Sequence, residues 1–481
     1  MQTRAATAYD WNTSPMPDKH AEFSFRRFFT KEEMELLRFG NIPQEMEDKW
    51  FWYYEDDRLY IHRSWTGFCI YIVRFTPGND ELHVTVNRDP EQYGCTDVNE
   101  DQYELNRLLG WWTQPDYNPY DQFISDTYRA LLPKMQKNRK PTVQESVQGC
   151  LFGGAAGDAL GYPVEFMSLD QIRAKYGPDG IQYYELKNRK AFFSDDTQML
   201  LFTLEAIYMW DAKRMNGCSD AKLNNCLFDA YRDWRYTQES DGPAKERHHP
   251  CTRLYHVFPM HAHMGPGYTC MRSLRGHQAG SIENPLNDSK GNGGVMRVAP
   301  IGFSFSREDF TMEEVMQMGA ESAALTHGHP LGYISAAMMA GLINECVYGA
   351  SETLRDAVQL SLDATVKMFA HIPETDELRT LVTSAMKLSQ EDGDAVAHIA
   401  TLGHSACAES TMAIVVYCAL HHEDSFDQAI RTAVNFNGDS DTIAAVTSNI
   451  LGAWKGIQCI DQKWINPLRM DRFLEALEYY S

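Results

Sequence analysis

The sequence lacks the cysteine spacing of a disulfide framework. Its 11 cysteines are scattered over 481 residues, and no two of them form a CxxC pair. An odd number of scattered cysteines in a long chain is typical of a reduced compartment, where disulfides do not persist. We therefore expect a cytoplasmic protein.

Long apolar runs are also absent. Residues 1–20 contain no continuous apolar stretch, which argues against a signal peptide. The apolar run at 413–420 is far shorter than the roughly 20 residues that a membrane-spanning helix needs. The sequence thus predicts no association with a membrane.

Positive charge is scarce, because 44 Lys and Arg face 66 Asp and Glu and leave a formal net charge of −22. A chain this acidic repels phosphate backbones, so a general nucleic-acid binder is disfavoured. The acidity favours solubility, and it would also attract basic partners or substrates that carry a guanidinium group.

Residues 1–140 show the pattern of a small α+β domain. Two β-hairpins are predicted, from runs at 50–54 with 59–63 and at 69–75 with 81–87. Helices are predicted at 31–38, 98–110 and 119–136. The aromatic run at 50–54 is interpreted as the core of a strand pair; the alternative is a surface for partner or substrate recognition that includes Trp65.

A basic, proline-flanked segment at 132–141 is interpreted as a linker, and helical periodicity dominates after it. Helices are predicted at 199–209, 312–324, 332–348, 351–368, 376–388, 408–420, 426–435 and 442–457. The predicted fold class is therefore mainly α, with an all-helical domain at 141–481 preceded by an α+β domain at 1–140.

Two oxygen-rich stretches each precede an apolar helix. They are Ser194-Asp195-Asp196-Thr197 and Asn437-Gly438-Asp439-Ser440-Asp441-Thr442. Each could be an ordinary N-cap, with acidic residues favoured by the helix dipole. If the two helix starts meet, however, their carboxylates repel unless divalent cations neutralise them, and such hard oxygens select Mg²⁺, Mn²⁺ or Ca²⁺. The pair therefore predicts a two-metal site.

Small residues at 153–161 predict either a close helix contact or a ligand site. Glu165 follows them between Val164 and Phe166, where a carboxylate is costly to bury without a function. The long irregular segment 237–293 is rich in Gly, Pro and His, and loops of that length are often functional.

The glycine-rich stretch 291–297 offers backbone N–H groups to a phosphate, and Arg297 would add positive charge; the alternative is a plain turn. His327 and His329 have no partner at zinc spacing, so we expect them to line a pocket or cap a helix.

Taken together, these stretches resemble the ADP-ribosylglycohydrolase family, the group that contains the dinitrogenase-reductase-activating glycohydrolase. The matching stretches, in family order over most of residues 148–457, are GCLFGGAAGDALGYPVEF, FSDDTQM, GPGYT, GNGGVMRVAP, THGHPLG and NFNGDSDTIAAVTSNILGAWKG. The arginine-directed branch is the most similar, through VEFM followed by Ile172 and Tyr176-Gly177-Pro178.

The resemblance implies an all-α fold with a cleft that holds two Mg²⁺, for which Mn²⁺ can substitute. The implied metal ligands are Ser194, Asp195, Asp196, Asp439, Asp441 and Thr442, and Glu165 is the implied catalytic acid/base. The implied substrate-binding residues are Asp158, Asn292, Gly293, Gly294, Met296 and His327. The family often has Thr where this chain has Ser194, and either hydroxyl supplies an oxygen ligand.

The resemblance also implies the reaction, which is hydrolysis of the bond between ADP-ribose and an acceptor. The expected substrate is a protein ADP-ribosylated on arginine, so that mono-ADP-ribosylation is reversed. The alternative is an immunity or binding protein that blocks an ADP-ribosyltransferase toxin, with or without hydrolase activity. A small ADP-ribosyl molecule or a modified nucleic acid is a third possible substrate, and the net charge disfavours the latter.

Overall fold

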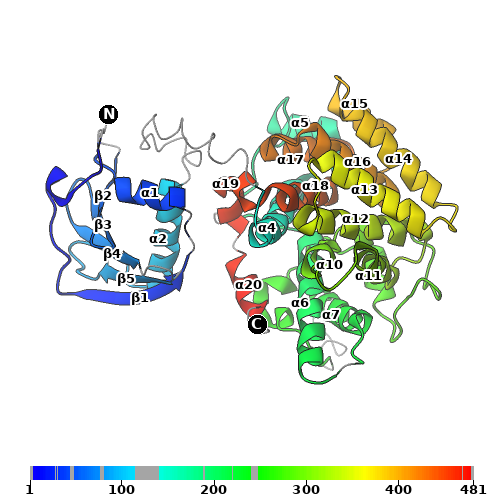
Figure 1. Cartoon of the computed structure of the whole chain (residues 1–481), viewed down its shortest axis with the longest axis horizontal. Helices are drawn as coiled ribbons and strands as arrows, with labels where there is room; N and C mark the ends of the chain where they lie inside the picture. Colours follow the sequence, from blue (N-terminus) through cyan, green and yellow to red (C-terminus); the bar gives the residue numbers. More distant parts are fainter. Residues whose placement is uncertain are drawn as a thin grey trace. The chain divides into compact units, whose positions relative to one another are not determined.

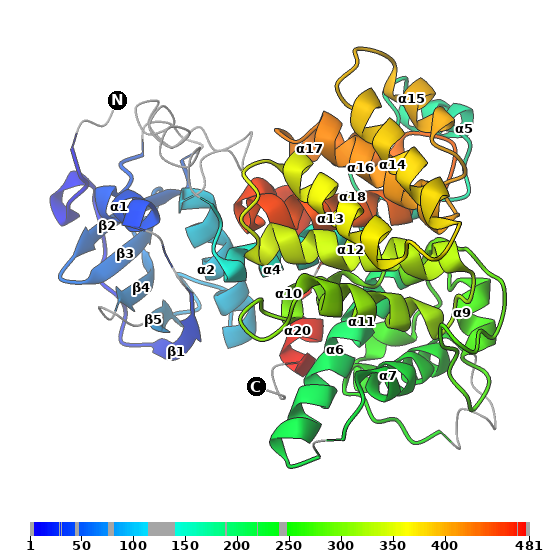
Figure 2. The same cartoon turned by 45° about the vertical axis from the view of Figure 1, so that its right-hand side comes forward.

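The computed structural model describes residues 4–27, 29, 31–43, 48–75, 81–113, 140–187, 190–218, 220–239, 248–468 and 470–477. The chain folds as two compact units, Met1–Arg139 and Lys140–Ser481 (Figures 1 and 2). The sheet belongs to the first unit and most of the helices to the second, which confirms the predicted fold class. The predicted helix at 119–136 and the predicted linker, apart from its last two residues, lie outside the described residues.

The first unit is built on a five-stranded antiparallel sheet with the order β1-β5-β4-β3-β2. The strands are β1 His20–Arg26, β2 Trp50–Glu55, β3 Arg58–Arg63, β4 Cys69–Phe75 and β5 Glu81–Asn87. Both predicted hairpins, β2–β3 and β4–β5, are confirmed. Strand β1 was not predicted; it pairs with β5, far along the chain, with Phe23 opposite Val84.

Helices α1 (Lys31–Phe39) and α2 (Val98–Thr113) lie on the same side of this sheet (Figure 1). Leu37 of α1 and Leu108 of α2 belong to the same buried cluster as Ile61 of β3. Trp112 of α2 stacks on Trp52 of β2, with ring centroids 4.1 Å apart. The run at 50–54 is thus part of an aromatic core, as predicted.

Among the described residues of the second unit, every regular element is a helix, apart from isolated bridges. Its α-helices are α4 Val143–Gly161, α5 Leu169–Tyr176, α6 Asp195–Met215, α7 Leu223–Gln238, α9 Tyr268–Ser273, α10 Ala299–Ser304, α11 Met312–Ala324, α12 Pro330–Tyr348, α13 Leu354–Met368, α14 Thr375–Leu388, α15 Ala395–Thr401, α16 Ala408–His421, α17 Phe426–Val434, α18 Ser440–Lys455, α19 Gln462–Ile465 and α20 Asp471–Leu477. Every helix predicted for this unit forms. The helices α5, α7, α9, α10, α15, α19 and α20 were not predicted, and α4 was anticipated only as a possible helix contact at 153–161.

Glycines allow α4 and α18 to pack side by side near the centre of the helical unit (Figures 1 and 2). A Cβ at Gly149 would lie 2.2 Å from the carbonyl oxygen of Gly452, and one at Gly157 would lie 2.2 Å from that of Ala444. No larger residue fits at such distances. The helix-contact interpretation of the small residues is therefore confirmed, and the contact brings the end of α4 to the start of α18.

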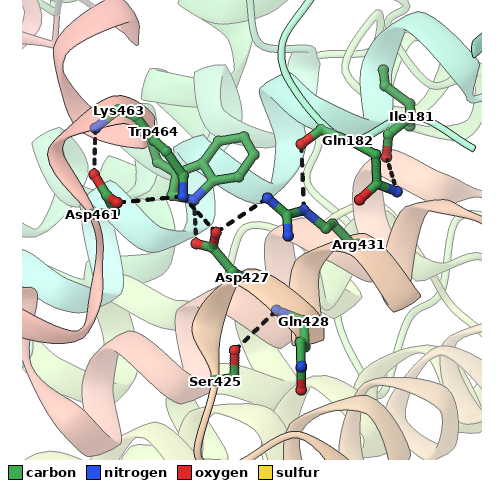
Figure 3. A network of polar contacts seen from close by, with 9 residues as sticks. All are labelled: Ile181, Gln182, Ser425, Asp427, Gln428, Arg431, Asp461, Lys463 and Trp464. Atoms are coloured by element: carbon green, nitrogen blue, oxygen red, sulfur yellow. Dashed lines mark hydrogen bonds and ion pairs between the residues drawn. The ribbon is translucent and has the colours of Figure 1, made fainter. Parts of the chain in front are cut away.

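A polar network fixes α17 against the C-terminal segment (Figure 3). The Asp427 carboxylate accepts hydrogen bonds from Trp464 Nε1 at 2.6 Å, Lys463 Nζ at 2.5 Å and Arg431 Nη2 at 3.2 Å. Arg431 Nε also donates to the carbonyl of Gln182 at 3.4 Å. These contacts hold α17 in place, and α17 leads directly into the loop that carries Asp439.

In the part of the chain that the structure describes, no helix combines the length and the apolar character needed to cross a bilayer. All 11 cysteines are free.

Candidate active site

Asp158, near the end of α4, is fully buried against the start of α6. Its Oδ1 accepts a hydrogen bond from the Ser194 N–H at 2.7 Å, and its Oδ2 accepts from the N–H and the hydroxyl of Thr197 at 3.0 and 2.5 Å. A carboxylate here satisfies free N–H groups of the first turn and favours the helix dipole. Since α6 engages both oxygens, Asp158 positions this helix, and its contact with substrate stays a prediction.

The first turn of α6 presents two buried carboxylates. Ser194 caps the helix, because its Oγ accepts from the Asp196 N–H at 3.2 Å. Asp195 Oδ2 accepts from the Gly267 N–H at 3.1 Å. Asp196 Oδ2 is buried and has no hydrogen-bond partner. The N-cap interpretation of Ser194 is thus correct, yet it leaves an oxygen of Asp196 unused.

The loop before α18 is held by its neighbours. The Asn437 side chain accepts from the Leu169 N–H at 2.7 Å, and the Asp439 N–H donates to Ser405 Oγ at 2.8 Å. The Asp441 carboxylate, in the first turn of α18, accepts from the N–H of the next residue at 3.0 Å. The second predicted helix start is therefore fixed at both of its aspartates.

Glu165, Asp439 and Asp441 form one cluster, in which each offers an oxygen within 4.8 Å of the other two. Glu165 directly follows the short 3-10 helix Tyr162–Val164 at the end of α4, and its Oε2 is buried without a hydrogen-bond partner. The residue predicted as the acid/base thus lies among the residues predicted as metal ligands. The sequence did not indicate this arrangement.

Several carboxyl groups of the site are buried close together, which raises the free energy of their charged forms. Burial raises the pKa of Glu165 to about 8 and that of Asp195 to about 8, and neighbouring carboxylates add to both shifts. Burial raises the pKa of Asp158 to about 6, against the hydrogen bonds it accepts. It also raises the pKa of Asp196 and Asp441 well above the usual range, and their mutual repulsion adds to this. The cluster therefore retains protons near neutral pH unless cations replace them.

The donors fit a hard divalent cation. Carboxylate and hydroxyl oxygens are what Mg²⁺ and Mn²⁺ prefer, and a cation neutralises crowded carboxylates. Thr442, in the first turn of α18, counters part of the rise in the pKa of Asp196, so the two helix starts lie next to each other. The two buried oxygens without partners, Asp196 Oδ2 and Glu165 Oε2, are where such a cation would find free ligands.

The glycine-rich stretch forms a 3-10 turn, Asn292–Gly294, beside this cluster. Asn292 Nδ2 donates to Asp439 Oδ2 at 2.8 Å and to the Ser405 carbonyl at 3.1 Å. A Cβ at Gly293 would lie 2.9 Å from Cε1 of His327, so a glycine is required for this contact. The structure thus brings Asn292, Gly293 and His327 together with the acid cluster.

Gly294 and Met296 are buried, and their predicted contact with ADP-ribose stays a prediction. The expectation that Arg297 adds charge for a phosphate is wrong. Arg297 is fully buried, and its Nη2 donates to the Ser322 carbonyl at 3.0 Å and to the Thr326 hydroxyl at 2.8 Å. These core contacts satisfy the guanidinium, which therefore does not face the site.

The two histidines differ in their surroundings. Nδ1 of His327 lies 2.8 Å from the Thr326 hydroxyl, and burial lowers the pKa of His327 to about 3, so the ring is neutral. Its Nε2 faces the glycine-rich turn, 3.4 Å from the position of a Cβ at Gly291. His329 caps α12, because its Nδ1 accepts from the Leu331 N–H at 3.1 Å. The cap-or-pocket interpretation is confirmed for His329.

The loop 264–269 was not among the predicted site residues, yet it contacts the acid cluster. Gly267 bonds Asp195, as described above, and Gly265 adopts a positive φ of 73°. A Cβ at Gly265 would lie 3.6 Å from Glu165 Oε2. The signal that could have found this loop is the GPGYT motif within the long irregular segment.

Known proteins were compared with the chain. A family model described as ADP-ribosylglycohydrolase matches residues 139–479. ADP-ribosylhydrolase ARH3 of Mus musculus is 28% identical over 37% of this chain and 52% of its own length. ADP-ribosylarginine hydrolase Tri1 of Serratia proteamaculans is 22% identical over 70% of this chain and 80% of its own. ADP-ribosyl-[dinitrogen reductase] glycohydrolase of Rhodospirillum rubrum is 24% identical over 69% of this chain and 92% of its own length.

Proposed function

Because the chain belongs to the ADP-ribosylglycohydrolase family, we propose that it hydrolyses the bond between C1″ of ADP-ribose and an arginine side chain of a modified protein. The observation that carries this proposal is the cluster of Glu165, Asp439 and Asp441, which the carboxylate of Asp195 adjoins. The relative named for ADP-ribosylarginine supports the choice of acceptor. The result would be reversal of mono-ADP-ribosylation.

Two Mg²⁺ ions, for which Mn²⁺ would substitute, are part of the proposal. The residues that would hold them are Ser194, Asp195, Asp196, Asp439, Asp441 and Thr442. When bound, the ions would neutralise the carboxylates and supply Lewis acidity to ribose hydroxyls and to an attacking water. The support for this assignment is the buried, unpaired oxygen of Asp196 and the crowding of carboxylates around it.

Glu165 is suited to proton transfer. Its raised pKa, about 8, keeps the carboxyl protonated at neutral pH, so it can donate a proton to the departing acceptor nitrogen and then accept one from water. Glycosidic cleavage passes through an oxocarbenium-like transition state, which the surrounding carboxylates would stabilise. Asp158 would act indirectly, by holding the start of α6.

The glycine-rich turn is proposed to bind the ADP part of the substrate. Backbone N–H groups at Gly293 and Gly294 would face the diphosphate, whereas the Asn292 N–H donates to the Ala406 carbonyl at 3.2 Å. The neutral ring of His327 packs on Gly293 and fixes the shape of this turn. Met296 would complete the wall from the interior side.

A substrate panel tests the proposal. Purified protein with Mg²⁺ is offered proteins or peptides ADP-ribosylated on arginine, serine or cysteine, and an ADP-ribosylated nucleic acid, and release of ADP-ribose is measured. We expect the highest kcat/KM on the arginine conjugate. A preference for another acceptor would overturn the choice of arginine, and release from none of them would overturn the hydrolase proposal itself.

The alternative is an immunity or binding protein that blocks an ADP-ribosyltransferase. What favours it is a separate N-terminal unit in which Trp65 is 71% exposed. Both roles can coexist, because the first unit could bind a partner while the helical unit removes the modification. Incubation of the full chain with a transferase and Mg²⁺, followed by size-exclusion chromatography, separates a stable complex from turnover alone.

A further inference from the structure

The loop 264–269 is fixed at both ends within the proposed site. At one end, the Met264 carbonyl and the Gly267 N–H both bond Asp195, at 2.9 and 3.1 Å. At the other end, in the first turn of α9, the Thr269 hydroxyl lies 3.2 Å from that of Ser289, which is three residues before the glycine-rich turn begins at Asn292. The loop therefore runs from the acid cluster to the turn proposed to hold ADP-ribose.

Two aromatic side chains project from this region without packing in the core. Tyr268 lies between the two fixed ends of the loop and is 75% exposed. Phe166 directly follows Glu165 and is 85% exposed. Single exposed apolar residues are ordinary on protein surfaces, but each of these adjoins a residue in contact with the acid cluster. Gly265, three residues before Tyr268, approaches Glu165, the residue before Phe166.

The chemistry of this pair favours a cation. The face of an aromatic ring attracts a guanidinium group, and tyrosine is among the better rings for this contact. A neutral hydroxyl acceptor such as serine would gain little from this contact.

We infer that Tyr268, assisted by Phe166, forms the acceptor subsite and selects a guanidinium-bearing acceptor side chain. This inference rests on the proposed hydrolase function and names the residues that set its preference. Tyr268 begins α9 directly after Gly267, whose N–H donates to Asp195, so the backbone that carries this ring is fixed next to the proposed metal ligands.

The test compares Tyr268→Ala, Tyr268→Phe and Phe166→Ala with the wild type, all as full chains with Mg²⁺. The matched control is Phe258→Ala, an aromatic of the same irregular segment that is 87% exposed. For the arginine conjugate, Tyr268→Ala should lower kcat/KM roughly three- to thirtyfold, the range expected for one lost cation–π contact. Tyr268→Phe keeps the ring and should retain most activity, Phe166→Ala should show a smaller loss, and the control should match the wild type.

Two further readouts separate this inference from the function on which it rests. The first is kcat/KM on a serine conjugate, which Tyr268→Ala should leave unchanged. The second is the affinity of arginine methyl ester for protein saturated with ADP-ribose, measured by calorimetry, which needs no turnover and should weaken by the same factor in Tyr268→Ala. Unaltered affinity and unaltered arginine kinetics, or equal losses on both conjugates, would overturn the acceptor subsite. A wild type that binds the ester through Tyr268 but releases no ADP-ribose would overturn the hydrolase function and leave the subsite standing.

Discussion

Glu165 is the residue on which the proposed chemistry depends most. Its carboxyl is partly buried, has an unpaired oxygen and lies within reach of two aspartates. Each of these features raises the cost of the charged form, which is the usual way in which proteins keep a carboxylic acid protonated near neutral pH.

Glu165→Gln should therefore abolish proton transfer while preserving the shape of the site. A positioned acid/base contributes roughly 10²–10⁴ to the rate, so kcat should fall by about that factor with little change in affinity for ADP-ribose. Steady-state kinetics and calorimetry measure the two quantities. Asp170→Asn, which alters an exposed carboxylate of α5, is the matched control. Turnover near the wild-type value would show that another group moves the proton.

The same raised pKa values predict how metal and pH act together on stability. Glu165 and Asp195 have folded-state pKa values of about 8, above their usual values of 4.5 and 3.8. The folded state therefore binds more protons than the unfolded state, and metal-free protein should lose stability as the pH rises from about 4 to about 8. A bound cation would replace the proton of the proposed ligand Asp195, though not that of Glu165, so the increase in Tm on adding Mg²⁺ should grow over the same interval.

Melting curves in EDTA and in Mg²⁺ at several pH values measure this effect. The double variant Asp196→Asn/Asp441→Asn, which removes two of the crowded charges, should show a flatter dependence of Tm on pH in EDTA. A Mg²⁺-induced increase in Tm that is the same at every pH would contradict the prediction.

At the scale of the element, the site depends on two helix starts that meet. α6 supplies Asp195 and Asp196, whereas α18 and the loop before it supply Asp439 and Asp441. Thr442 of α18 lowers the pKa of Asp196 of α6 across this junction, against the larger effect of burial. Neither helix start alone provides a complete set of oxygen ligands.

Chelation should therefore abolish activity, and Mg²⁺ or Mn²⁺ should restore it. Asp195→Ala and Asp439→Ala should each remove most turnover while the fold persists, because a carboxylate is lost from a repelling group rather than from the apolar core. ADP-ribose release and circular dichroism measure the two properties. Full activity in excess EDTA would end the two-metal proposal.

The approach of α4 to α18 predicts a structural sensitivity at Gly157. An added methyl group would lie 2.2 Å from the carbonyl oxygen of Ala444, so the helices must separate. Overpacking costs about 1–3 kcal/mol, and the roughly 1 kcal/mol by which Ala exceeds Gly in a helix offsets part of it. Gly157→Ala should thus lower both Tm and kcat, because separation displaces Asp158 and Asp441.

The control is a helical glycine with room for a methyl group. A Cβ at Gly110 in α2 would meet its nearest atom, Arg27 Nη2, at an ordinary 3.6 Å. Gly110→Ala should leave activity unchanged and stability unchanged or higher. If Gly157→Ala behaves in the same way, the close approach of α4 and α18 does not determine the site.

At the scale of the whole molecule, the chain divides into a sheet-based unit and a helical unit, each with its own buried core. The family match falls on residues 139–479 and leaves the first unit without an assigned role. The residues of the proposed site all belong to the helical unit.

Residues 140–481 should therefore fold alone and hydrolyse a small ADP-ribosyl substrate as fast as the full chain does. If the first unit recognises a protein, the fragment should lose activity on a large modified protein, and Trp65→Ala in the full chain should reproduce part of that loss. The measurement is kcat/KM of the fragment, the variant and the full chain on the small substrate and on the large modified protein. A soluble fragment that is equally active on every substrate would exclude a recognition role for the first unit.

The sequence by itself determined the fold class and which residues to examine. Helical periodicity located eight helices of the second unit, because an amphipathic helix such as α11 buries one apolar face and exposes the other. Strand-like runs of residues separated by turn residues located the two hairpins, because both strands of a hairpin and its turn are neighbours in the sequence. Strand β1 escaped prediction because its partner, β5, lies far along the chain, and local pattern carries no information about such a pairing.

Only the tertiary structure decided which of these residues come into contact and how deeply each is buried. By sequence alone, the aspartate-rich starts of α6 and α18 are indistinguishable from ordinary N-caps, and Ser194 does cap α6. Only the packing of the helices shows that the two starts meet. Likewise, nothing local indicated that Arg297 is buried in the core, or that Gly265 approaches Glu165. Burial and charge repulsion depend on distances between segments far apart in the chain, and these distances exist only once the helices have packed.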